Sequence, residues 1–409
     1  MPRLGLRGPF LKEERSRILA ASLVNSRTGG RRLTLALALS LIATLLGGLI
    51  GAAAADAKKK SDRVRVMTRN IYLGADLGPG LAATTPQQFF EANGGILRQV
   101  TRTNFPLRAR ALAAEILHNR PDLVGLQEVA LWRTAPPSLT PVLSGPSATT
   151  VRYDFLQLLL NQLNQGKQRY RAVVVKPEFD FEAPANENGR ADDGPDAPDG
   201  LLADAEINGR LTMRDVILAR NGTAVTANPR SGTFENLLTV TVSGIPIEVT
   251  RGWTTVDAKV KKSRWFHFVN SHLEAFDDET QRPSIRAQQA SELVAPGGPA
   301  RAFPLPVIML GDFNSHNPPV QPGDEQAFNV LTGAGFFERD THRPHSCCLS
   351  DPNLVGGSLA DFDHSVDHIM TSSPNLVTLQ RSKVVGLGKV NGIFPSDHAG
   401  IVSRLRLKR

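Results

Sequence analysis

The stretch Val307-Ile-Met-Leu-Gly-Asp-Phe-Asn314 sets two polar side chains directly after a run of apolar residues. The run predicts a buried strand, and a buried strand that feeds a glycine turn holds the next side chains at a rigid rim. The Asp-x-Asn spacing places Asp312 and Asn314 on one side of an extended segment, where one holds a metal or accepts a proton and the other donates to a phosphoryl oxygen. A turn closed by bonds from these side chains to the backbone is the alternative, and this motif alone does not decide between the two.

Three further segments also place acidic, amide or imidazole side chains at the edge of a predicted strand. They are Asp122-Leu-Val-Gly-Leu-Gln-Glu128, Ser365-Val-Asp-His368 and Ser396-Asp-His398. Asn70 and His272 each end a predicted strand in the same way. Together these segments supply hard oxygen ligands and imidazoles, which is the equipment for metal-assisted attack on a phosphate ester.

Glu128 and Asn70 are candidate ligands of a metal ion. A carboxylate at the end of a buried strand suits Mg²⁺ or Mn²⁺, which prefer oxygen donors and keep waters for the substrate. An amide at the end of the first strand binds a phosphate oxygen or a metal-bound water. The alternatives are a glutamate that leaves the sheet into solvent and an asparagine that closes a turn.

Two Asp-His pairs, Asp367-His368 and Asp397-His398, point to a general base. An aspartate fixes the tautomer of a histidine and raises its basicity. Neighbouring residues on a strand project from opposite faces, so Asp397 is expected to orient a histidine other than His398, or a metal-bound water. The sequence leaves open which aspartate serves which histidine. His398 is favoured as a site residue because it precedes the last strand, whereas His368 is equally well a plain strand residue.

Periodicity and turn residues predict one catalytic domain over residues 63–409, richer in strands than in helices. The predicted strands cover 64–70, 122–129, 170–176, 214–220, 237–242, 245–250, 265–272, 307–310, 365–370, 382–387 and 401–407. The predicted helices cover 86–119, 153–163 and 283–293, and 133–149 is predicted to be a loop. In the strand 265–272, His272 lies at the end, whereas His267 lies in the middle and is expected to be packed or solvated. Residues 177–210 are expected to form an acidic loop insertion; a calcium loop on Asp192, Asp193, Asp196 and Asp199 is less favoured.

The net charge of +8 belongs to the N-terminal segment. Residues 1–60 carry 11 Lys and Arg against 3 Asp and Glu, whereas residues 61–409 carry 36 of each sign. Charge alone therefore gives no warrant for a polyanionic partner. Residues 1–57 are predicted to be an export leader, because the apolar run 33–50 leads to an Ala55-Asp-Ala57 cleavage site, and residues 58–62 are a linker. We expect a secreted protein; an uncleaved leader that anchors the chain to the membrane is the alternative.

The two cysteines, Cys347 and Cys348, are adjacent in the sequence. A bond between neighbours is expected to be strained. His342 and His345 lie upstream, so a site for a soft metal is conceivable. A loop that holds a redox-labile pair is the favoured interpretation.

In their order along the chain, these motifs resemble those of the endonuclease/exonuclease/phosphatase superfamily, from Arg65 to Leu405. The most specific are Leu310-Gly-Asp-Phe-Asn314, Leu126-Gln-Glu128 and Ser396-Asp-His398. The resemblance implies an α+β fold, a four-layer α-β-β-α sandwich in which two packed mixed β-sheets are flanked by helices. The segment Asn70-Ile-Tyr-Leu-Gly-Ala-Asp-Leu77 is similar to that of exported bacterial members.

The resemblance also implies how the acidic and amide candidates would act. Asn70 and Glu128 would flank the metal, and Asp397 would supply a further carboxylate to it. The metal would be Mg²⁺, with Mn²⁺ or Ca²⁺ as alternatives. Asp312 and Asn314 would position the attacking water and the phosphate.

The histidines would complete the site on the same resemblance. His272 would stabilise the phosphoryl oxygens, Asp367 would orient a catalytic histidine, and His398 would be the general base. Two departures leave the substrate open: Arg69 stands where many relatives carry Trp, and no residue is assigned as the site tyrosine of the family.

The predicted function is a divalent-metal-dependent hydrolase of phosphate esters, of the phosphodiesterase or nuclease kind. The substrate would be a nucleic acid, a phospholipid or an inositol phosphate. A sphingomyelinase-like lipid phosphodiesterase and an inositol phosphate phosphatase are the alternatives. A non-catalytic binding module is less favoured, because all of Glu128, Asp312, Asn314, Asp397 and His398 are present. No obligate protein partner is evident, and we expect a monomer.

Overall fold

The computed structural model describes residues 62–408, except 191–201, 203, 243, 278–279, 303, 317–324 and 341–344. The predicted leader, residues 58–61 of the predicted linker, the four aspartates considered for a calcium loop and His342 lie outside the described residues. Within the described part of the chain, no helix is both long and apolar enough to cross a membrane.

The larger sheet, here called sheet A, brings the first and last strands of the domain together. Its strands are β1 Arg63–Asn70, β2 Leu123–Gln127, β3 Leu131–Ala135, β4 Thr150–Asp154, β5 Tyr170–Ala185, β6 Ile207–Arg220, β15 Val377–Val385 and β16 Gly400–Leu407. The order is β15-β16-β1-β2-β6-β3-β4, and β5 also pairs with β6. Strand β1 runs parallel to β2 and antiparallel to β16, so the start of β16 lies beside the end of β1.

The second sheet, sheet B, contains Val307–Asp312, the apolar run and first acidic residue of the Asp-Phe-Asn motif. Its strands are β7 Ala224–Thr233, β10 Gly252–Val260, β11 Phe266–His272, β12 Val307–Asp312, β13 Phe337–Glu338 and β14 Asp367–Thr371. The order is β13-β14-β12-β11-β10-β7, with β11 and β12 parallel. A hairpin of β8 Leu238–Val242 and β9 Ile245–Val249 forms a separate two-stranded sheet.

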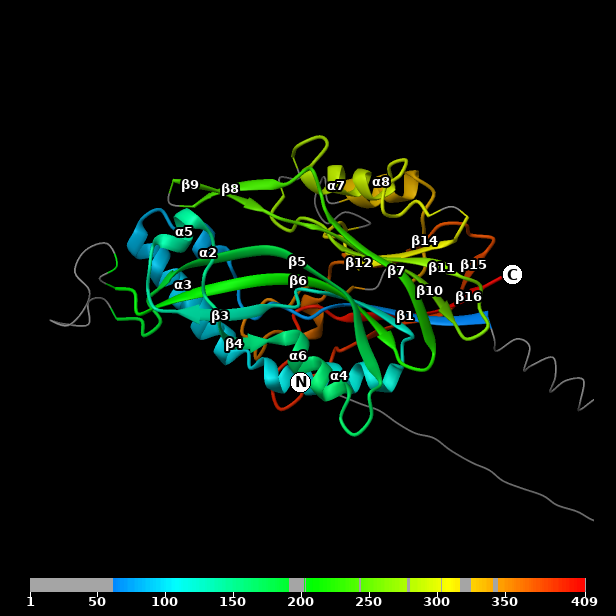
Figure 1. Cartoon of the computed structure of the whole chain (residues 1–409), viewed down its shortest axis with the longest axis horizontal. Coiled ribbons are helices and arrows are strands. Elements are labelled where there is room, and N and C mark those ends of the chain that lie inside the picture. The colour runs from blue at the N-terminus through cyan, green and yellow to red at the C-terminus, as the bar shows by residue number, and fades with distance from the viewer. Residues whose placement is uncertain are drawn as a thin grey trace, which may run out of the picture. The chain divides into compact units, whose positions relative to one another are not determined.

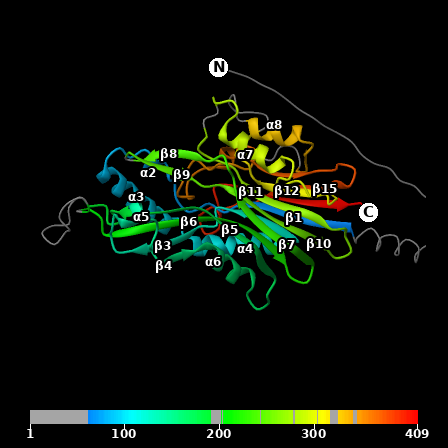
Figure 2. The same ribbon diagram turned by 45° about the horizontal axis from the view of Figure 1, so that its top comes forward.

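Helices cover the outer faces of both sheets. They are α2 Gly78–Leu81, α3 Pro86–Arg102, α4 Phe105–Asn119, α5 Thr140–Ser144, α6 Phe155–Leu163, α7 Ile285–Val294, α8 Gln326–Gly333 and the 3-10 helix η2 Leu359–Asp361. Helices α3, α4 and α6 pack on sheet A, and α7 and α8 pack on sheet B (Figures 1 and 2). The expected α+β class, a four-layer α-β-β-α sandwich with two mixed sheets, is confirmed.

Alternation along the strands decides which side chains enter the space between the sheets. In β1, Val66 belongs to the core between the sheets, whereas Met67 belongs to the core under the helices. In β12, Leu310 faces sheet A. Because side chains alternate with period two, Asn70 and Asp312 project into the space between the sheets at the ends of their strands.

Gly125 marks a place where the two sheets approach closely. A Cβ atom there would lie 2.3 Å from Leu310 Cδ1 and 2.4 Å from Asn270 Oδ1. Two residues further along β2, Gln127 Nε2 donates a hydrogen bond of 2.6 Å to Asn270 Oδ1, which joins sheet A to sheet B. The glycine of the Leu-Val-Gly-Leu-Gln run therefore permits the contact that begins the polar end of the sandwich.

The single helix predicted over 86–119 is wrong, because the segment forms two helices. Helix α3 ends at Arg102, and α4 begins at Phe105. Between them, Asn104 adopts a φ of +43° and accepts a hydrogen bond from the Leu107 N–H through its side chain. Asparagine tolerates this left-handed conformation and caps a following helix.

The limits of three irregular segments are also corrected. Residues 133–135 of the predicted loop belong to β3, and the predicted helix 153–163 begins only at Phe155, after the N-cap Asp154. Residues 177–185 of the expected acidic insertion continue β5, because its pairing with β6 extends as far as Ala185. Helices α2, α5 and α8 and strands β3, β4, β7, β10 and β13 were not predicted, and α5 lies within the predicted loop 133–149. Most of β7 is exposed, so it lacks the apolar alternation of a half-buried strand.

Candidate active site at the junction of the two sheets

Three polar side chains form a row on the face of sheet B that meets sheet A. His272 of β11 pairs in register with Asp312 of β12, and Asp312 pairs with Asp367 of β14. Residues directly opposite each other on neighbouring strands project from the same face. All three are buried, and His272 Nε2 lies 3.6 Å from Asp312 Oδ2. Strand register therefore brings together groups that are far apart in the sequence.

His398 reaches this row from the loop before β16. Its Nδ1 lies 2.9 Å from Asp367 Oδ2, and its Nε2 lies 3.6 Å from Asp312 Oδ2. The contact with Asp367 fixes a proton on Nδ1, so it is the Nε2 atom that gains or loses the second proton, on the side of Asp312. Burial opposes protonation of His398, but the charges of Asp367, Asp312 and Asp397 outweigh it and raise the pKa of the imidazole well above its ordinary value. Of the two aspartates left open by the sequence, Asp367 contacts His398.

Asn70 joins sheet A to both neighbouring carboxylates. Its Nδ2 donates to Glu128 Oε1 and to Asp312 Oδ2, each over 3.0 Å. Its Oδ1 accepts the N–H of Tyr72 at 2.9 Å, which fixes the orientation of the amide because an N–H bonds only to the oxygen. Asn70 thus places two acidic groups from different sheets against one side chain.

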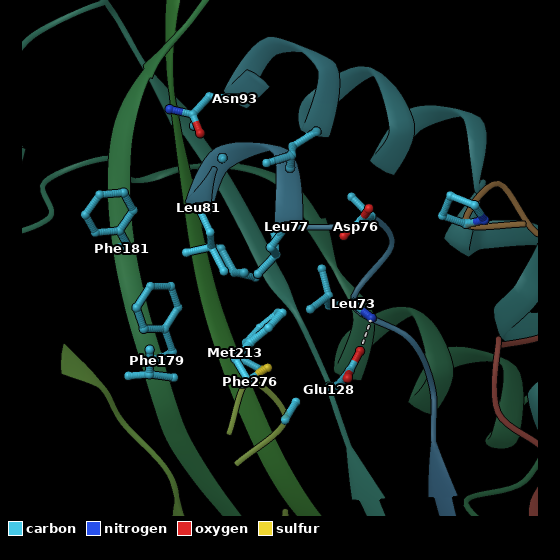
Figure 3. Close-up of a pocket in the computed structure, with 18 of the residues that line it drawn as sticks. Leu73, Asp76, Leu77, Leu81, Asn93, Glu128, Phe179, Phe181, Met213 and Phe276 are labelled. Atoms are coloured by element: carbon cyan, nitrogen blue, oxygen red, sulfur yellow. Dashed lines mark hydrogen bonds between the residues drawn. The ribbon is translucent and has the colours of Figure 1, made fainter. Parts of the chain in front are cut away.

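Glu128 and Asp397 face one cavity beside the row. Glu128 Oε2 accepts the Leu73 N–H at 2.8 Å, which Figure 3 shows as a dashed line. Burial raises the pKa of Glu128, and the Asp397 carboxylate raises it further. Two carboxylates that line one cavity offer oxygen donors, which suit Mg²⁺ or Mn²⁺. These residues therefore fit a divalent cation.

Groups of three potential metal ligands lie within 4.8 Å of one another at three places among the described residues. They are Asp312 with Asp367 and His398, Cys347 with Cys348 and His398, and Glu338 with Asp340 and His368. The first group joins Asp312 and Asp367 of the row to His398, whose Nδ1 already occupies Asp367 Oδ2. The pair of Glu128 and Asp397 is outside these groups, each of which has three His, Cys, Asp or Glu side chains. Asn70, the other predicted ligand, turns its Nδ2 toward Glu128 and its Oδ1 toward the Tyr72 N–H.

Left-handed backbone conformations occur at three residues around the site. Glu128 has a φ of +59°, Tyr72 of +57° and Asn314 of +47°. Such values are uncommon for residues other than glycine. At Glu128 the positive φ interrupts the alternation of β2, which would otherwise send the side chain to the helix-covered face. The local strain is therefore what turns the carboxylate toward Asn70 and Leu73.

His272 has a partner that the sequence analysis missed. Arg251 Nη1 lies 3.2 Å from His272 Nδ1, and Arg251 Nε lies 3.5 Å from Glu274 Oε2. A guanidinium only donates, so His272 Nδ1 accepts and its ring proton sits on Nε2. Burial lowers the pKa of His272 well below its ordinary value, and Arg251 lowers it further. The imidazole is neutral and offers one N–H. Arg251 precedes β10, a strand that periodicity did not reveal, so it carried no recognisable signal.

Asn314 closes a turn after β12. Asp312 Oδ1 accepts the Asn314 N–H at 3.0 Å, and Asn314 Nδ2 donates to the Leu273 carbonyl at 3.1 Å. The turn considered as an alternative for this motif is thus present. It leaves Asp312 Oδ2 directed at Asn70, His272 and His398, so turn formation and site formation are compatible.

Two other histidines point away from the row. His368 Nδ1 lies 2.8 Å from Glu338 Oε1, and its Nε2 lies 2.9 Å from the Ser315 carbonyl. His267 Nδ1 lies 2.7 Å from Asp257 Oδ1, and its Nε2 is bonded to a backbone carbonyl. Both nitrogens of each ring are occupied, and the mid-strand position of His267 is packed, as expected from the sequence.

Cys347 and Cys348 lie side by side next to His398. Their Sγ atoms lie 3.5 and 3.8 Å from His398 Nε2. The preceding residue, Ser346, accepts the Asp367 N–H through its hydroxyl at 3.3 Å. Among the described residues, the histidine that contacts the sulfurs is His398. No local motif could show this contact, because it joins segments about fifty residues apart.

Arg69 stands beneath the site, on the face of β1 covered by helix α4. Its Nη1 donates to the carbonyl of Asn70 at 3.2 Å and to the carbonyl of His398. Its Nε lies 3.3 Å from Glu115 Oε1 of α4. The side chain is fully buried. Arg69 therefore ties the end of β1 to the loop that carries His398.

Comparison with solved structures returns proteins of low identity and similar chain length. An endonuclease/exonuclease/phosphatase family protein from Bacteroides thetaiotaomicron is 15% identical over 85% of this chain and 95% of its own, with a TM-score of 0.49. A mannosyl-6-phosphatase from the same organism is 16% identical over 84% and 99%, with a TM-score of 0.47. The catalytic domain of human Nocturnin, with a bound sulfate anion, is 16% identical over 85% and 94%, with a TM-score of 0.43.

The sequence itself matches a family model. Comparison with curated proteins finds no match. Residues 90–398 match the model described as Endonuclease/Exonuclease/phosphatase family, a span that begins within α3 and includes the candidate residues from Glu128 to His398. The chain belongs to the endonuclease/exonuclease/phosphatase family, whose members are hydrolases acting on phosphate esters.

Proposed function

We propose that the protein is a secreted, divalent-metal-dependent hydrolase of phosphodiesters. The observation that carries the proposal is the position of His398, with Nδ1 2.9 Å from Asp367 and Nε2 3.6 Å from Asp312. An imidazole held by a carboxylate on one nitrogen, with the other facing a buried polar site, is suited to take a proton from water. Glu128 and Asp397 line the adjacent cavity with oxygen donors.

In the proposed reaction, water attacks phosphorus in line with the leaving oxygen. The neutral form of His398 accepts a proton from the water through Nε2, and Asp367 stabilises the imidazolium that forms. The new P–O bond replaces the bond to the leaving alcohol, which takes up a proton, so a diester and water give a monoester and an alcohol. A divalent cation at Glu128 and Asp397 would supply charge that offsets the negative phosphoryl oxygens.

The remaining residues of the row position the reactants. Asp312 Oδ2 lies 3.6 Å from both His398 Nε2 and His272 Nε2, so it is placed to accept a hydrogen bond from the attacking water. The neutral His272 donates its Nε2–H to a phosphoryl oxygen. Asn70 holds Glu128 and Asp312 in place through its amide nitrogen. We assign the cation to Glu128 and Asp397 because Asp367 is occupied by His398.

Hydrolysis of bis-(p-nitrophenyl) phosphate tests this proposal directly. Purified protein is assayed with Mg²⁺, Mn²⁺ or Ca²⁺ added singly, and after treatment with EDTA. We expect chelation to abolish release of p-nitrophenol, and Mg²⁺ or Mn²⁺ to restore it. Release that continues in excess EDTA would contradict the metal-dependent mechanism.

Secretion is proposed from the sequence of residues 1–57 alone. N-terminal sequencing of protein from the culture medium should begin near Lys58, directly after the Ala55-Asp-Ala57 site. Cell-bound protein that retains the full leader would instead show a membrane anchor.

A further inference from the structure

An apolar cavity of about 430 Å³ adjoins the candidate active site. Its volume falls within the roughly 300–1,000 Å³ of pockets that bind small molecules. Leu77, which precedes α2, and Leu81 of α2 point into it, as do Phe179 and Phe181 of β5 (Figure 3). Met213 of β6 lines it as well. Apolar side chains from several distant segments therefore converge on one space.

The β8–β9 hairpin supplies one wall of this cavity. Val240 and Ile247 are cross-strand partners and both line the cavity. Their neighbours Thr241 and Glu248 are exposed on the opposite face. The hairpin pairs with neither large sheet, and an isolated hairpin has little stability in water. Its alternation thus directs a strip of apolar side chains at the cavity rather than at the core of either sheet.

The same cavity reaches the acidic residues of the site. Glu128 and Asp397 both line it, and Figure 3 shows Glu128 on the side away from Phe181. Phe276, another lining residue, is 45% exposed, so the apolar lining continues to the solvent. A molecule in this space would place a charged group at the carboxylate end, through a divalent cation, and an uncharged group against the hydrophobic walls.

The polar groups of the lining leave little for a sugar or a nucleobase to bind. Asn93 Nδ2 donates to a backbone carbonyl at 3.0 Å, and the Tyr72 hydroxyl donates to another at 2.9 Å. Among the described lining residues Arg251 is the only cation, and it is engaged with Glu274 and His272. A nucleic acid needs a basic groove, and a polar group buried without a partner is costly. A hydrocarbon chain needs no basic groove and buries no polar group.

We propose that this cavity binds the hydrocarbon chain of a phospholipid-type phosphodiester, with the phosphate at Glu128 and Asp397. The proposal rests on the proposed function, because it takes the phosphate to be the group that is hydrolysed. It names an amphipathic phosphodiester as the substrate class, and it assigns chain recognition to α2, β5 and the β8–β9 hairpin.

A series of alkyl p-nitrophenyl phosphates tests the proposal, with ethyl, butyl, hexyl and octyl chains kept below the concentration at which micelles form. Each methylene that enters the cavity should raise kcat/KM by about two- to fourfold, so the octyl ester, with its six additional methylenes, should exceed the ethyl ester by about 60-fold or more. A kcat/KM independent of chain length would overturn the proposal. So would faster turnover of the p-nitrophenyl ester of thymidine 5′-phosphate than of the octyl ester.

Variants of the β8–β9 hairpin test whether the dependence of kcat/KM on chain length arises in this cavity. Ile247→Trp fills the cavity and should lower the octyl-to-ethyl ratio of kcat/KM by at least about tenfold. Glu248→Trp, its outward-facing neighbour, should leave the ratio unchanged. Leu81→Trp fills the cavity from α2 and provides a second variant if the hairpin does not tolerate the first. The ratio cancels any general loss of activity, so an unchanged ratio in both cavity variants would contradict the assignment.

Binding without catalysis separates this proposal from the proposed function. Titration of the His398→Gln protein, which lacks the base, with decylphosphocholine in Mg²⁺, followed by calorimetry, should show saturable binding that a further Ile247→Trp or Leu81→Trp weakens and a further Glu248→Trp does not. Saturable binding by a protein that hydrolyses no phosphodiester would refute the function and keep the chain site. Hydrolysis of the ethyl ester without binding of the amphiphile would refute the chain site and keep the function.

Discussion

Strand β14 carries two carboxylate–imidazole pairs, one on each face. On the face toward sheet A, Asp367 holds His398 at 2.9 Å, and on the outer face, Glu338 holds His368 at 2.8 Å. Both rings are buried, and both have a raised pKa. Side-chain alternation along the strand is what separates Asp367 from its neighbour His368.

The two pairs differ in the second nitrogen of the ring. His368 Nε2 is bonded to the Ser315 carbonyl at 2.9 Å, and the ring packs against Phe313 and Phe328. His398 Nε2 instead faces Asp312 at 3.6 Å, beside the residues that line the cavity. A buried pair of this kind therefore becomes a candidate base only when its outer nitrogen remains available to a reactant.

The largest expected effect separates the two histidines. His398→Gln should lower kcat by about 10²–10⁴-fold, because a positioned base is lost. His368→Gln should leave kcat within a few-fold of the wild type, because that ring does not reach the site. Steady-state hydrolysis of bis-(p-nitrophenyl) phosphate at saturating Mg²⁺ measures both. Equal losses in the two variants would remove the distinction drawn between the pairs.

Removing the carboxylate that holds His398 should lower kcat more than removing the carboxylate that holds His368. Asp367→Asn should lower kcat by about 10²-fold, because the imidazolium loses its countercharge and its fixed tautomer. Glu338→Gln serves as the matched control and should have little effect on kcat. An Asp367→Asn enzyme as active as the control would show that His398 does not depend on this contact.

A variant that lacks a metal ligand should recover activity at high Mg²⁺, whereas a variant that lacks the base should not. Glu128→Gln should raise the Mg²⁺ concentration needed for half-maximal activity by about tenfold or more, since even residues outside the ligand shell affect metal affinity by about 10–100-fold. Part of its activity should return at high Mg²⁺ by mass action. Mg²⁺ titrations of Glu128→Gln and His398→Gln check this. Rescue of His398→Gln alone would exchange the two assignments.

The smallest effect concerns stability on the outer face of β14. Burial alone would lower the pKa of His368, but the hydrogen bond to Glu338 and the charges of Glu338 and Asp340 raise it to about 9, above the ordinary 6.5. Because the pKa is higher in the folded state, the protonated ring stabilises the fold fully below pH 6.5, and this contribution disappears as the pH rises through 9. Urea unfolding should show the wild type more stable than His368→Gln at pH 6, by a margin that narrows by pH 9.5. If the difference in unfolding free energy between the two proteins did not change with pH, protonation of His368 would not contribute to the stability of the fold.

Much of the sandwich followed from local patterns in the sequence. The apolar run 307–310 and the alternation of 64–70 predicted β12 and β1, because a side-chain period of two reflects how a strand is buried. The elements that were not predicted depend on contacts with neighbouring strands or on single backbone conformations. β7 is a largely exposed strand of sheet B, and the outer part of β5 is held by its pairing with β6 rather than by its own composition. The break between α3 and α4 depends on one left-handed asparagine, Asn104.

The residue types of the site were recognisable before any fold was known. Each of Asn70, His272 and Asp312 ends a strand, and a polar side chain at the end of an apolar segment stands out against its neighbours. The side chains that contact these residues were not recognisable from the sequence. Arg251 meets His272 only because β10 and β11 are adjacent, and the cysteines meet His398 through a contact between distant loops.

The sequence by itself thus determined the strands that end in Asn70, His272 and Asp312, the candidate polar residues and the chemistry that carboxylates, amides and imidazoles support. Only the tertiary structure decided that Asp367 rather than Asp397 holds His398, that His368 faces away, and that an apolar cavity adjoins Glu128. The physical reason is that side-chain identity and periodicity are local properties. Register between strands, the meeting of two sheets and the walls of a cavity arise from contacts between segments that the chain brings together only on folding.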